Sequence, residues 1–400
     1  MTYRFPKTTW ECRTNQQENS KESQMKKIER RKSIVVAVGV VASIILIGAT
    51  VPAFAASSGI SRSGSAEVKA SGKIVSKSFC GTKKITLGVL DGYGMNAWSQ
   101  ASYAAVRSEA AKCSNVTVIA QAGQGDLAKS ISQVNSLVSQ GVGAITIIPD
   151  FGKAQLPSIQ AATAAGVKVV PWGADPGGVN GTDYVGYVDW SSPSAGTLWA
   201  RWMVKRLHGK GNVVFLGGPA GNPVTTGQLS SVVAEFARYP GIKLLTGNTS
   251  WSVTNWDPAT AQADMSALLS KYPKIDGLIS DYGTDALAAL RAIKAAGRSL
   301  IPTATLEANG LGCLWKSDGS ASSKFQLATI SSRNWLGRIA ARKAIAAAEG
   351  ISLNEPNIIS LPITEDSTGA NKPVCVASAA DDVYNSNLLT AAELSKYGTP

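Results

Sequence analysis

Residues 85–98 read ITLGVLDGYGMNAW, a short apolar strand that ends in an acid and a glycine turn. The turn, 92–97, matches G-x-G-x-x-A, one form of the dinucleotide-binding fingerprint. That fingerprint also needs an acid about 20 residues further on, at the end of the second strand, to bind the ribose hydroxyls. Here the second strand ends in AQAG, 120–123, without an acid, and the bulk of Trp98 would crowd a pyrophosphate at the helix N-terminus. The stretch therefore argues against a nicotinamide or flavin cofactor, and we expect none.

The same turn offers three other groups: the carboxylate of Asp91, the amide of Asn96 and the indole of Trp98. Hydrogen-bonding groups beside an aromatic plate suit a neutral polyol such as a sugar, whose apolar face stacks on the ring while its hydroxyls meet the amide and carboxylate. The alternative is that Trp98 is a core residue at the start of a helix.

Outward from this stretch, the chain repeats one pattern from residue 84 onward. An apolar, β-branched run is followed by a loop, an amphipathic helix and another apolar run. Leu127, Ile131, Val134, Leu137 and Val138, for example, share one helical face. The expected strands are 85–90, 116–120, 144–148, 167–171, 212–216, 242–245, 277–280 and 300–304.

Apolar strands joined by helices predict parallel sheets that are covered on both faces. Two successive runs of such units predict an α/β protein of two similar lobes, each a doubly wound parallel sheet flanked by helices. Ligands of such sheets bind at the carboxyl ends of the strands. The residues that follow each strand are therefore the candidates for a binding site; Trp172 and Asp175 follow the fourth strand.

The N-terminal part is typical of an export leader. Basic residues after Met25 precede an apolar run, 34–51, and Ala53-Phe-Ala55 fits the small-x-small rule for cleavage before Ala56. We expect a leader over 1–55, with a possible true start at Met25, and a flexible Ser/Gly/Ala-rich linker over 56–79. The protein is then exported to the periplasm or outer cell surface. The apolar run is also near the minimum length of a membrane span, so an uncleaved N-terminal tether is the alternative.

Composition limits the other function classes. The net charge is +12 over 400 residues, but no later block of five or six like charges follows the basic front, so we expect no nucleic-acid partner. The sole histidine, His208, is placed at a helix end, where a cation is favourable. Asp281 and Asp285 could do acid–base work on one helical face, although helix capping would also explain Asp281. We expect a non-enzymatic protein, with an α/β enzyme acting on a sugar as a remote alternative.

Four cysteines follow the leader: Cys80, Cys113, Cys313 and Cys375. An even number in an oxidising compartment predicts disulfides, and four cysteines allow three pairings. Cys80 precedes the first strand and Cys113 precedes the second, so both lie at one edge of a sheet, where a bridge is easily formed. Cys313 is then left to pair with Cys375.

Several stretches carry a resemblance to a known family. They are 85–112 with Asn96-Ala-Trp98, 141–150 (GVGAITIIPD), 165–172 (AGVKVVPW) and 256–293. Together they resemble the type I periplasmic solute-binding proteins of ABC transporters, in the branch of the ribose- and galactose-binding proteins, over about residues 83–362. The resemblance implies two lobes joined by a hinge of three chain crossings, which would lie near 189–192, 331–333 and 361–364.

The resemblance also implies roles for individual residues. Asn96 and Trp98 match polar and aromatic ligand contacts of the first lobe, and Trp256 matches an aromatic plate of the second lobe. Tyr282 follows a second-lobe strand where sugar binders often have Asn. Glu307 falls near a ligand-binding Asp, and Arg333, beside Ser332, falls near a polar contact at a lobe crossing.

The chain departs from the family pattern at two places. The Asp-Arg pair often found after the fourth strand is replaced by Gly173-Ala-Asp175. The segment 221–228 lacks the second-lobe Arg of ribose and galactose binders, so recognition there would use Thr225, Thr226 or Gln228. These departures leave a small polar solute as the expected ligand class.

On the family's plan, lobe I comprises 80–190 and 334–361, lobe II comprises 191–333 and 362–390, and 391–400 form a C-terminal tail. Each predicted disulfide then stays within one lobe and leaves the hinge free. The expected function is a monomeric, exported receptor that captures a monosaccharide or polyol between its lobes and delivers it to a membrane permease. The alternative is a receptor that signals to a chemoreceptor or kinase without transport.

Overall fold

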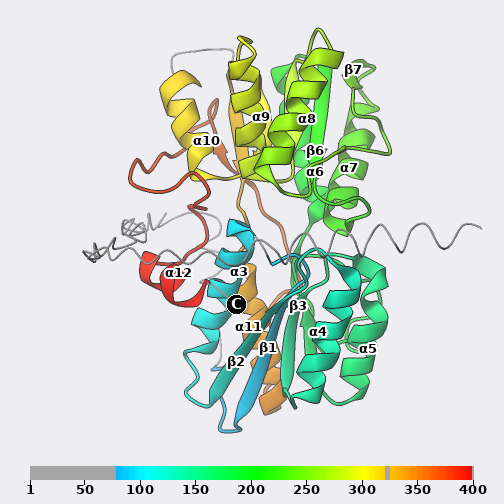
Figure 1. Ribbon diagram of the computed structural model, residues 1–400, viewed down its shortest axis with the longest axis vertical. Helices are drawn as coiled ribbons and strands as arrows, with labels where there is room; N and C mark the ends of the chain where they lie inside the picture. Colours follow the sequence, from blue (N-terminus) through cyan, green and yellow to red (C-terminus); the bar gives the residue numbers. More distant parts are fainter. Residues whose placement is uncertain (1–77, 95, 320–324, 399–400) are drawn as a thin grey trace, which may run out of the picture. The chain divides into compact units, whose positions relative to one another are not determined.

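The chain forms two α/β lobes in a computed structural model that describes residues 78–94, 96–319 and 325–398 (Figure 1). The predicted leader and all but the last two residues of the predicted linker lie outside the described residues. Among the helices that the structure describes, none is both long and apolar enough to cross a bilayer.

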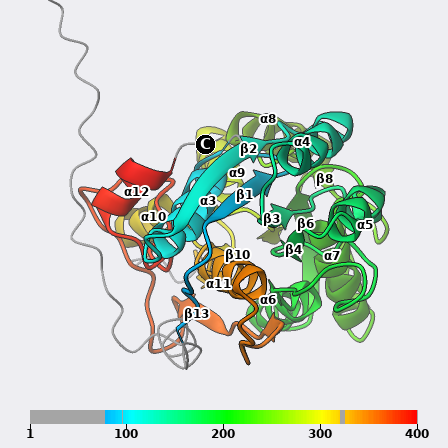
Figure 2. The same cartoon turned by 90° about the horizontal axis from the view of Figure 1, so that it is seen from below.

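Lobe I is built on a parallel four-stranded sheet of order β2-β1-β3-β4. Helices α3 and α11 cover one face and α4 and α5 cover the other, as Figure 2 shows. Its elements are β1 (Ile85–Asp91), α3 (Ala97–Ala110), β2 (Val116–Ala122), α4 (Leu127–Ser139), β3 (Ala144–Ile148), α5 (Leu156–Ala164), β4 (Lys168–Pro171) and α11 (Leu336–Glu349).

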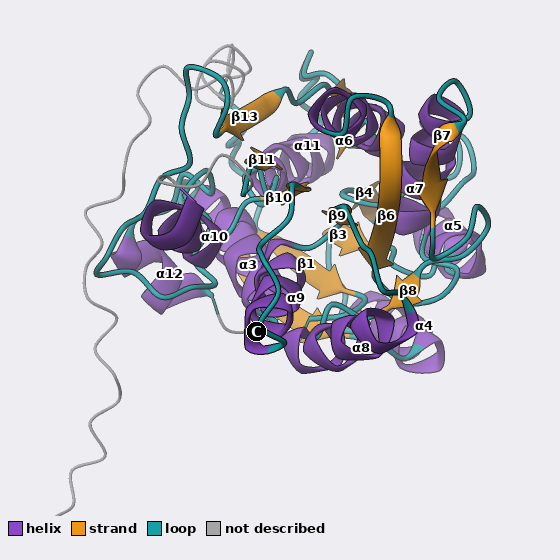
Figure 3. Ribbon diagram, turned by 90° about the horizontal axis from the view of Figure 1, so that it is seen from above, coloured by secondary structure: helices purple, strands orange, loops and turns teal. Residues whose placement is uncertain are grey.

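Lobe II is built on a larger sheet of order β13-β11-β10-β9-β6-β7, in which β8 also pairs with β6 and only β13 runs antiparallel to its neighbour. Helices α6 and α7 lie on one face and α8 and α9 on the other (Figure 3). Its elements are α6 (Ser192–Arg206), β6 (Lys210–Gly217), α7 (Pro223–Phe236), β7 (Gly241–Leu244), β8 (Ser252–Val253), α8 (Pro258–Lys271), β9 (Gly277–Ser280), α9 (Gly283–Ala295), β10 (Thr303–Leu306), α10 (Asn309–Leu314), β11 (Leu327–Ile330) and β13 (Ile363–Asp366).

Side chains that point alternately to the two faces of each strand explain why helices cover both faces of the sheets. In β1, Leu87 and Val89 pack in the cluster that contains Val106 of α3, whereas Leu90 packs in the cluster that contains Leu137 of α4. A strand that is apolar on both faces can only be satisfied by helices on both faces, so the doubly wound arrangement predicted for both lobes is confirmed.

One predicted strand is misplaced along the chain. The apolar run 300–304 was expected to be a strand, but β10 begins at Thr303. Pro302 lacks an N–H, and its carbonyl oxygen instead accepts a hydrogen bond from the Leu278 N–H at the edge of β9, 2.9 Å away. The strand therefore starts after the proline.

The chain crosses between the lobes after β5 (Asp189–Trp190), after β11, and between β12 (Ile358–Ile359) and β13. β5 and β12 pair with each other in parallel, which joins two of the crossings. The three crossings of the predicted hinge are therefore present.

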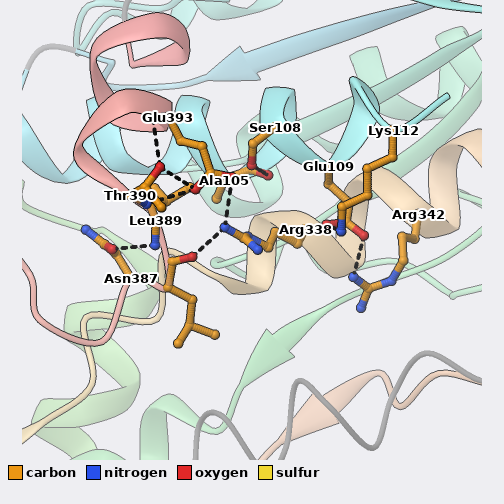
Figure 4. A network of polar contacts seen from close by, with 11 residues as sticks. Ala105, Ser108, Glu109, Lys112, Arg338, Arg342, Asn387, Leu389, Thr390 and Glu393 are labelled. Carbon is orange, nitrogen blue, oxygen red and sulfur yellow. Dashed lines mark hydrogen bonds and ion pairs between the residues drawn. The ribbon is translucent and has the colours of Figure 1, made fainter. Parts of the chain in front are cut away.

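The C-terminal segment makes a further connection. Residues 391–398, predicted as a tail, contain α12 (Ala391–Tyr397), which packs on α3 of lobe I. Arg338 of α11 fixes this segment: its Nη2 donates to the Leu388 carbonyl oxygen at 2.6 Å and lies 3.7 Å from Glu393 Oε1. Figure 4 shows this network beside the buried ion pair of Arg342 with Glu109, 2.9 Å. The segment thus returns from lobe II to lobe I.

Both disulfides have the predicted pairing. Cys80 is bonded to Cys113, with 5.3 Å between their Cα atoms, and Cys313 to Cys375, with 4.5 Å. The first bridge ties the start of β1 to the end of α3, and the second ties α10 to the segment after β13.

Candidate ligand-binding site

A cavity with an empty volume of about 440 Å³ lies between the lobes, at the carboxyl ends of their strands. Both lobes contribute to its walls. The lining residues are Asp91, Tyr93, Asn96, Trp98, Ser99, Ile148, Asp150, Val224, Trp256, Asp281, Tyr282, Leu306 and Arg333.

The start of α3 forms one wall. Asn96 is the N-cap, and its side-chain oxygen accepts a hydrogen bond from the Ser99 N–H at 3.0 Å. Two residues on, the Trp98 indole stacks on Trp172, with ring centroids 6.1 Å apart, and donates its N–H to the Ser332 carbonyl oxygen at 2.7 Å. The indole is therefore held in place from behind while it lines the cavity.

The floor of the lobe I side carries two carboxyl groups. Asp91 is 2% exposed, and its Oδ1 accepts hydrogen bonds from the N–H groups of Tyr93, 2.8 Å, and Gly94, 2.9 Å. Asp150 lies two residues after the end of β3, the strand that neighbours β1. Burial raises the pKa of both groups, and for Asp150 the negative charge of Asp91 raises it further.

Asp281 is the carboxyl group of the lobe II side. It accepts hydrogen bonds from the Thr225 hydroxyl, from the Gly218 N–H at 3.2 Å and from the Trp256 indole N–H at 3.1 Å. Burial raises its pKa to about 6, because desolvation outweighs these three donors. Helix capping does not explain this acid, because the N-cap of α9 is Tyr282 and no side chain caps that helix.

Trp256 stands beside Asp281 in a constrained position. Its backbone has a φ of +53°, and its indole lies so close to Gly218 that a Cβ there would be 2.2 Å from the ring. A glycine at 218 is therefore needed for the indole to reach the cavity wall.

Arg333 is the cation of the cavity. Its guanidinium lies between two indoles, 5.0 Å from the Trp98 ring and 4.6 Å from the Trp190 ring. Burial lowers its pKa, and the charges of three carboxylates, chiefly Asp189, oppose that shift. Since its backbone φ is +62°, this crossing of the hinge is held in a rare conformation.

The structure brings six of the ten predicted ligand-binding residues together on the cavity wall. They are Asp91, Asn96, Trp98, Trp256, Tyr282 and Arg333.

The other four lie elsewhere. Trp172 is buried behind Trp98. Asp175 is exposed and accepts a hydrogen bond from the Gly177 N–H at 2.7 Å, which makes it a turn residue. Thr226 points outward on α7, with its hydroxyl bonded to the Asn222 carbonyl oxygen at 2.8 Å.

Glu307, the fourth, is buried below the hinge instead of facing the cavity. Its Oε1 accepts hydrogen bonds from the Ser332 N–H at 3.0 Å and the Ser386 N–H at 3.2 Å. It thereby joins β10, a crossing and the C-terminal segment, which is a structural role.

Sequence reasoning missed three polar residues of the wall, Tyr93, Ser99 and Asp150, and saw Asp281 only as a possible acid or cap. Asp150 and Asp281 could have been found, because each is an acid directly after a strand whose carboxyl end faces the cavity. Tyr93 had no comparable signal, since the direction of its side chain depends on the backbone path of the turn between Gly92 and Gly94.

The two lobes also touch each other at the mouth of the cavity. The Tyr93 hydroxyl of lobe I donates to the Asn255 carbonyl oxygen of lobe II, and its ring meets the Trp256 ring edge-on at 5.4 Å. Beside them, the Asn222 side-chain amide donates to the Asp150 carbonyl oxygen at 2.9 Å. These contacts join the two lobes beside the cavity.

The arrangement suits binding by stacking and hydrogen bonds. Within the described part of the chain, no group of three or more His, Cys, Asp or Glu side chains is placed to hold a metal ion. His208 precedes the amino end of β6, whereas the cavity lies at the carboxyl ends of the strands.

Comparison with known proteins gives a matching family and named relatives. Residues 88–351 match the model described as periplasmic binding protein domain. The chain is 32% identical over 193 residues to a xylitol-binding protein of Mycolicibacterium smegmatis. This match covers 48% of this chain and 53% of the relative. It is 27% identical over 187 residues to the D-xylose-binding periplasmic protein of Escherichia coli, and this match covers 46% of this chain and 54% of the relative. The chain thus spans about half the length of the curated relatives it matches.

Solved structures show the same fold. An arabinose-binding component of an ABC transporter from Shewanella superposes with a TM-score of 0.61 at 20% identity, over 69% of this chain and 89% of that one. A solute-binding protein from Agrobacterium vitis with bound allitol gives a TM-score of 0.61 at 21% identity, over 70% of this chain and 95% of that one. At such identities the likeness concerns the fold alone.

Proposed function

Because this chain belongs to the periplasmic binding protein family, we propose that it is an exported receptor that binds a neutral monosaccharide or polyol in the cavity between its lobes. We further propose that it delivers this ligand to the membrane permease of an ABC transporter. The relatives are named as binding proteins and not as enzymes, which agrees with the expectation of a non-enzymatic protein.

One observation supports the ligand class above the others: indoles and carboxyl groups from both lobes line the same cavity. Trp98 and Asp91 come from lobe I, and Trp256 and Asp281 come from lobe II. An indole covers the apolar C–H face of a sugar or polyol, and carboxylate oxygens accept hydrogen bonds from its hydroxyls. A ligand that engages both walls stabilises the closed arrangement of the lobes.

Calorimetric titration tests the ligand class. The purified protein is titrated with pentitols, hexitols, inositols and aldoses, and with NAD as the cofactor control. We expect heat from at least one polyol or sugar and none from NAD. Asp281→Asn should weaken that binding, whereas Asp382→Asn, an exposed acid outside the cavity wall, should not. Saturable binding of NAD with no response to any polyol would overturn the proposal.

Delivery to a permease needs its own test, because a sensory receptor would bind ligand equally well. A strain that lacks this gene should lose uptake of the labelled ligand, and a plasmid copy should restore it. Normal uptake together with a lost transcriptional or motility response would favour the signalling alternative.

Export is tested by N-terminal sequencing of protein recovered outside the cytoplasm. We expect mature chains that begin at Ala56. An intact leader in the membrane fraction would favour an N-terminal tether.

A further inference from the structure

We propose that the carboxyl groups of Asp91 and Asp150 form a subsite for two hydroxyl groups on neighbouring carbon atoms of the ligand, and that binding releases one proton from the pair. This inference rests on the proposed function, because it concerns the same cavity and the same ligand class.

The sheet of lobe I brings the two acids together. β1 and β3 are adjacent parallel strands, and their register places Asp91 opposite Ile148. Asp150 follows Ile148 by two residues, and its carboxyl group lies against Gly92: a Cβ on that glycine would be 2.9 Å from Asp150 Oδ2. Glycine at 92 therefore allows the second carboxyl group to approach the first.

Each acid keeps one oxygen free for a ligand. The Oδ2 atoms of Asp91 and Asp150 are both buried, and neither accepts a hydrogen bond of normal geometry from a described residue. The Ser99 hydroxyl lies near Asp91 and the Tyr93 N–H lies near Asp150, and each lowers the pKa of its neighbour without offsetting the effect of burial. Asp150 Oδ2 lies against Gly92, the residue that follows Asp91, and the two carboxyl groups are close enough for each to change the pKa of the other. Two acceptors can be joined only through a proton on one of them, because two charged carboxylates this close repel each other.

The surroundings favour that shared proton in the absence of ligand. Burial is the largest cause of the raised pKa of both groups. The facing charged and titratable groups are the Arg333 guanidinium from the hinge and the phenols of Tyr93 and Tyr103. Arg333 lowers the pKa of Asp150, but its charge is shared with Asp189 and Asp281, so it offsets only part of the desolvation.

Two neighbouring hydroxyl groups would replace this proton. Each hydroxyl donates its hydrogen to one Oδ2, both carboxyl groups become ionised acceptors, and the displaced proton passes to the solvent. No covalent bond of the ligand changes. A hydrogen bond to an ionised acceptor is stronger than one to a neutral acceptor, which favours the ionised pair in the complex. The extra negative charge faces the Arg333 guanidinium.

The experiment counts protons by calorimetry. The full-length protein is titrated with xylitol and with myo-inositol at pH 6 and pH 8, in phosphate and in imidazole, whose heats of ionisation differ. For a polyol that binds, we expect the buffer dependence of the heat to show release of up to one proton at pH 6 and less at pH 8. The affinity should rise with pH, by at most about tenfold per pH unit.

Variants separate the pair from the rest of the cavity. Asp281 also titrates near pH 6, so the pair is tested in the Asp281→Asn background. There Asp150→Asn supplies a permanent amide donor to Asp91, so proton release and the pH dependence of affinity should disappear and binding should weaken about ten- to a hundredfold. Asp281→Asn should also weaken binding but retain proton release. Asp382→Asn should match the parent in both measurements.

The ligand side of the inference is tested with the monodeoxy analogues of whichever polyol binds. Two analogues altered at neighbouring carbons should lose affinity and proton release together. Tight binding without proton release, or release that persists when Asp150→Asn is combined with Asp281→Asn, would overturn the subsite and leave the proposed function intact. If an amine-bearing analogue binds more tightly than the neutral polyol, the two acids recognise an ammonium group and not a pair of hydroxyl groups, and the diol subsite is wrong. Absence of binding by every sugar and polyol tested would overturn the proposed function and this inference with it.

Discussion

Trp98 and Trp256 are the two indoles of the cavity wall, one from each lobe. We expect truncation of either to Ala to weaken ligand binding by about 2–4 kcal/mol, roughly thirty- to a thousandfold in affinity, because each loses a stacking surface. Trp98→Ala should also lower the free energy of unfolding, since this indole packs on Trp172 and bonds to Ser332.

Titration of the variants and urea unfolding without ligand measure the two effects separately. Trp315→Ala, at an indole outside the cavity wall, is the matched control and should change stability without changing affinity. If Trp98→Ala and Trp256→Ala bind as tightly as the parent and only unfold more easily, these residues are ordinary core.

Asp189 and Asp281 make a second prediction at this scale. Burial raises the pKa of each to about 6, above the value of 3.8 expected in the unfolded chain. Between these pH values the folded state binds more protons than the unfolded state, so the free energy of unfolding falls as pH rises from about 4 to 6. Each group should contribute a loss of about 3 kcal/mol, after which the curve levels.

Urea unfolding of ligand-free protein at pH 4, 5, 6 and 7 measures this slope. Since other carboxylates contribute with either sign, the informative quantity is the difference between the parent and Asp281→Asn. We expect the free energy of unfolding to fall less steeply with rising pH in Asp281→Asn than in the parent. Parallel curves for the two proteins would contradict the raised pKa of Asp281.

At the scale of elements, the disulfides fix segments that surround the lobes. The bridge from Cys80 to Cys113 closes 33 residues and that from Cys313 to Cys375 closes 62. Replacing either pair by Ser should lower the free energy of unfolding by about 2–5 kcal/mol, with at most a slightly larger effect for the longer loop. Because neither bridge lines the cavity, ligand affinity measured well below the melting temperature should stay within about twofold of the parent. A variant that unfolds normally but loses binding would show that a bridge positions the site.

The predictability of the elements follows from their physical signals. Buried parallel strands such as β3 are short apolar runs that the sequence displays directly, and β3 was placed at its observed bounds. β13 was missed because it is a four-residue antiparallel edge strand, ITED, with charged residues. β10 was placed too early because Leu300 and Ile301 extend its apolar run past a proline.

The site was less predictable than the fold. Trp98 was proposed from the residues of the glycine turn and Arg333 from the family resemblance, whereas Asp150 was not proposed although it follows a predicted strand. Its importance depends on its meeting Asp91 across two strands, and a single sequence does not display that pairing. Trp172 shows the converse: an aromatic residue after a strand can support the wall from behind instead of facing the ligand.

At the scale of the whole molecule, the contacts at the mouth of the cavity hold the lobes together. The Tyr93 hydroxyl of lobe I bonds to the Asn255 carbonyl oxygen of lobe II. Removing it in Tyr93→Phe loses about 1 kcal/mol of closed-state stabilisation, which corresponds to about a fivefold smaller closed population.

Two measurements check this prediction. Stopped-flow kinetics should show faster ligand dissociation from Tyr93→Phe, and small-angle scattering of ligand-free protein should show a larger radius of gyration. Tyr239→Phe, a tyrosine of the lobe II core outside the cavity wall, should behave like the parent in both. Unchanged dissociation in Tyr93→Phe would show that the hydroxyl does not restrain opening.

The return of the C-terminal segment to lobe I has a consequence for the order of synthesis. Helix α3 is made early, yet the helices that pack on it, α11 and α12, come only after nearly all of lobe II. At typical elongation rates of about 5–20 residues per second, the first lobe waits roughly tens of seconds for its last pieces. Lobe II has a continuous stretch from α6 to β11 and can begin to assemble first. A nascent chain of this protein therefore stays incompletely folded at its amino-terminal end until translation is nearly finished, which keeps that end in a form that can still be threaded through a narrow channel.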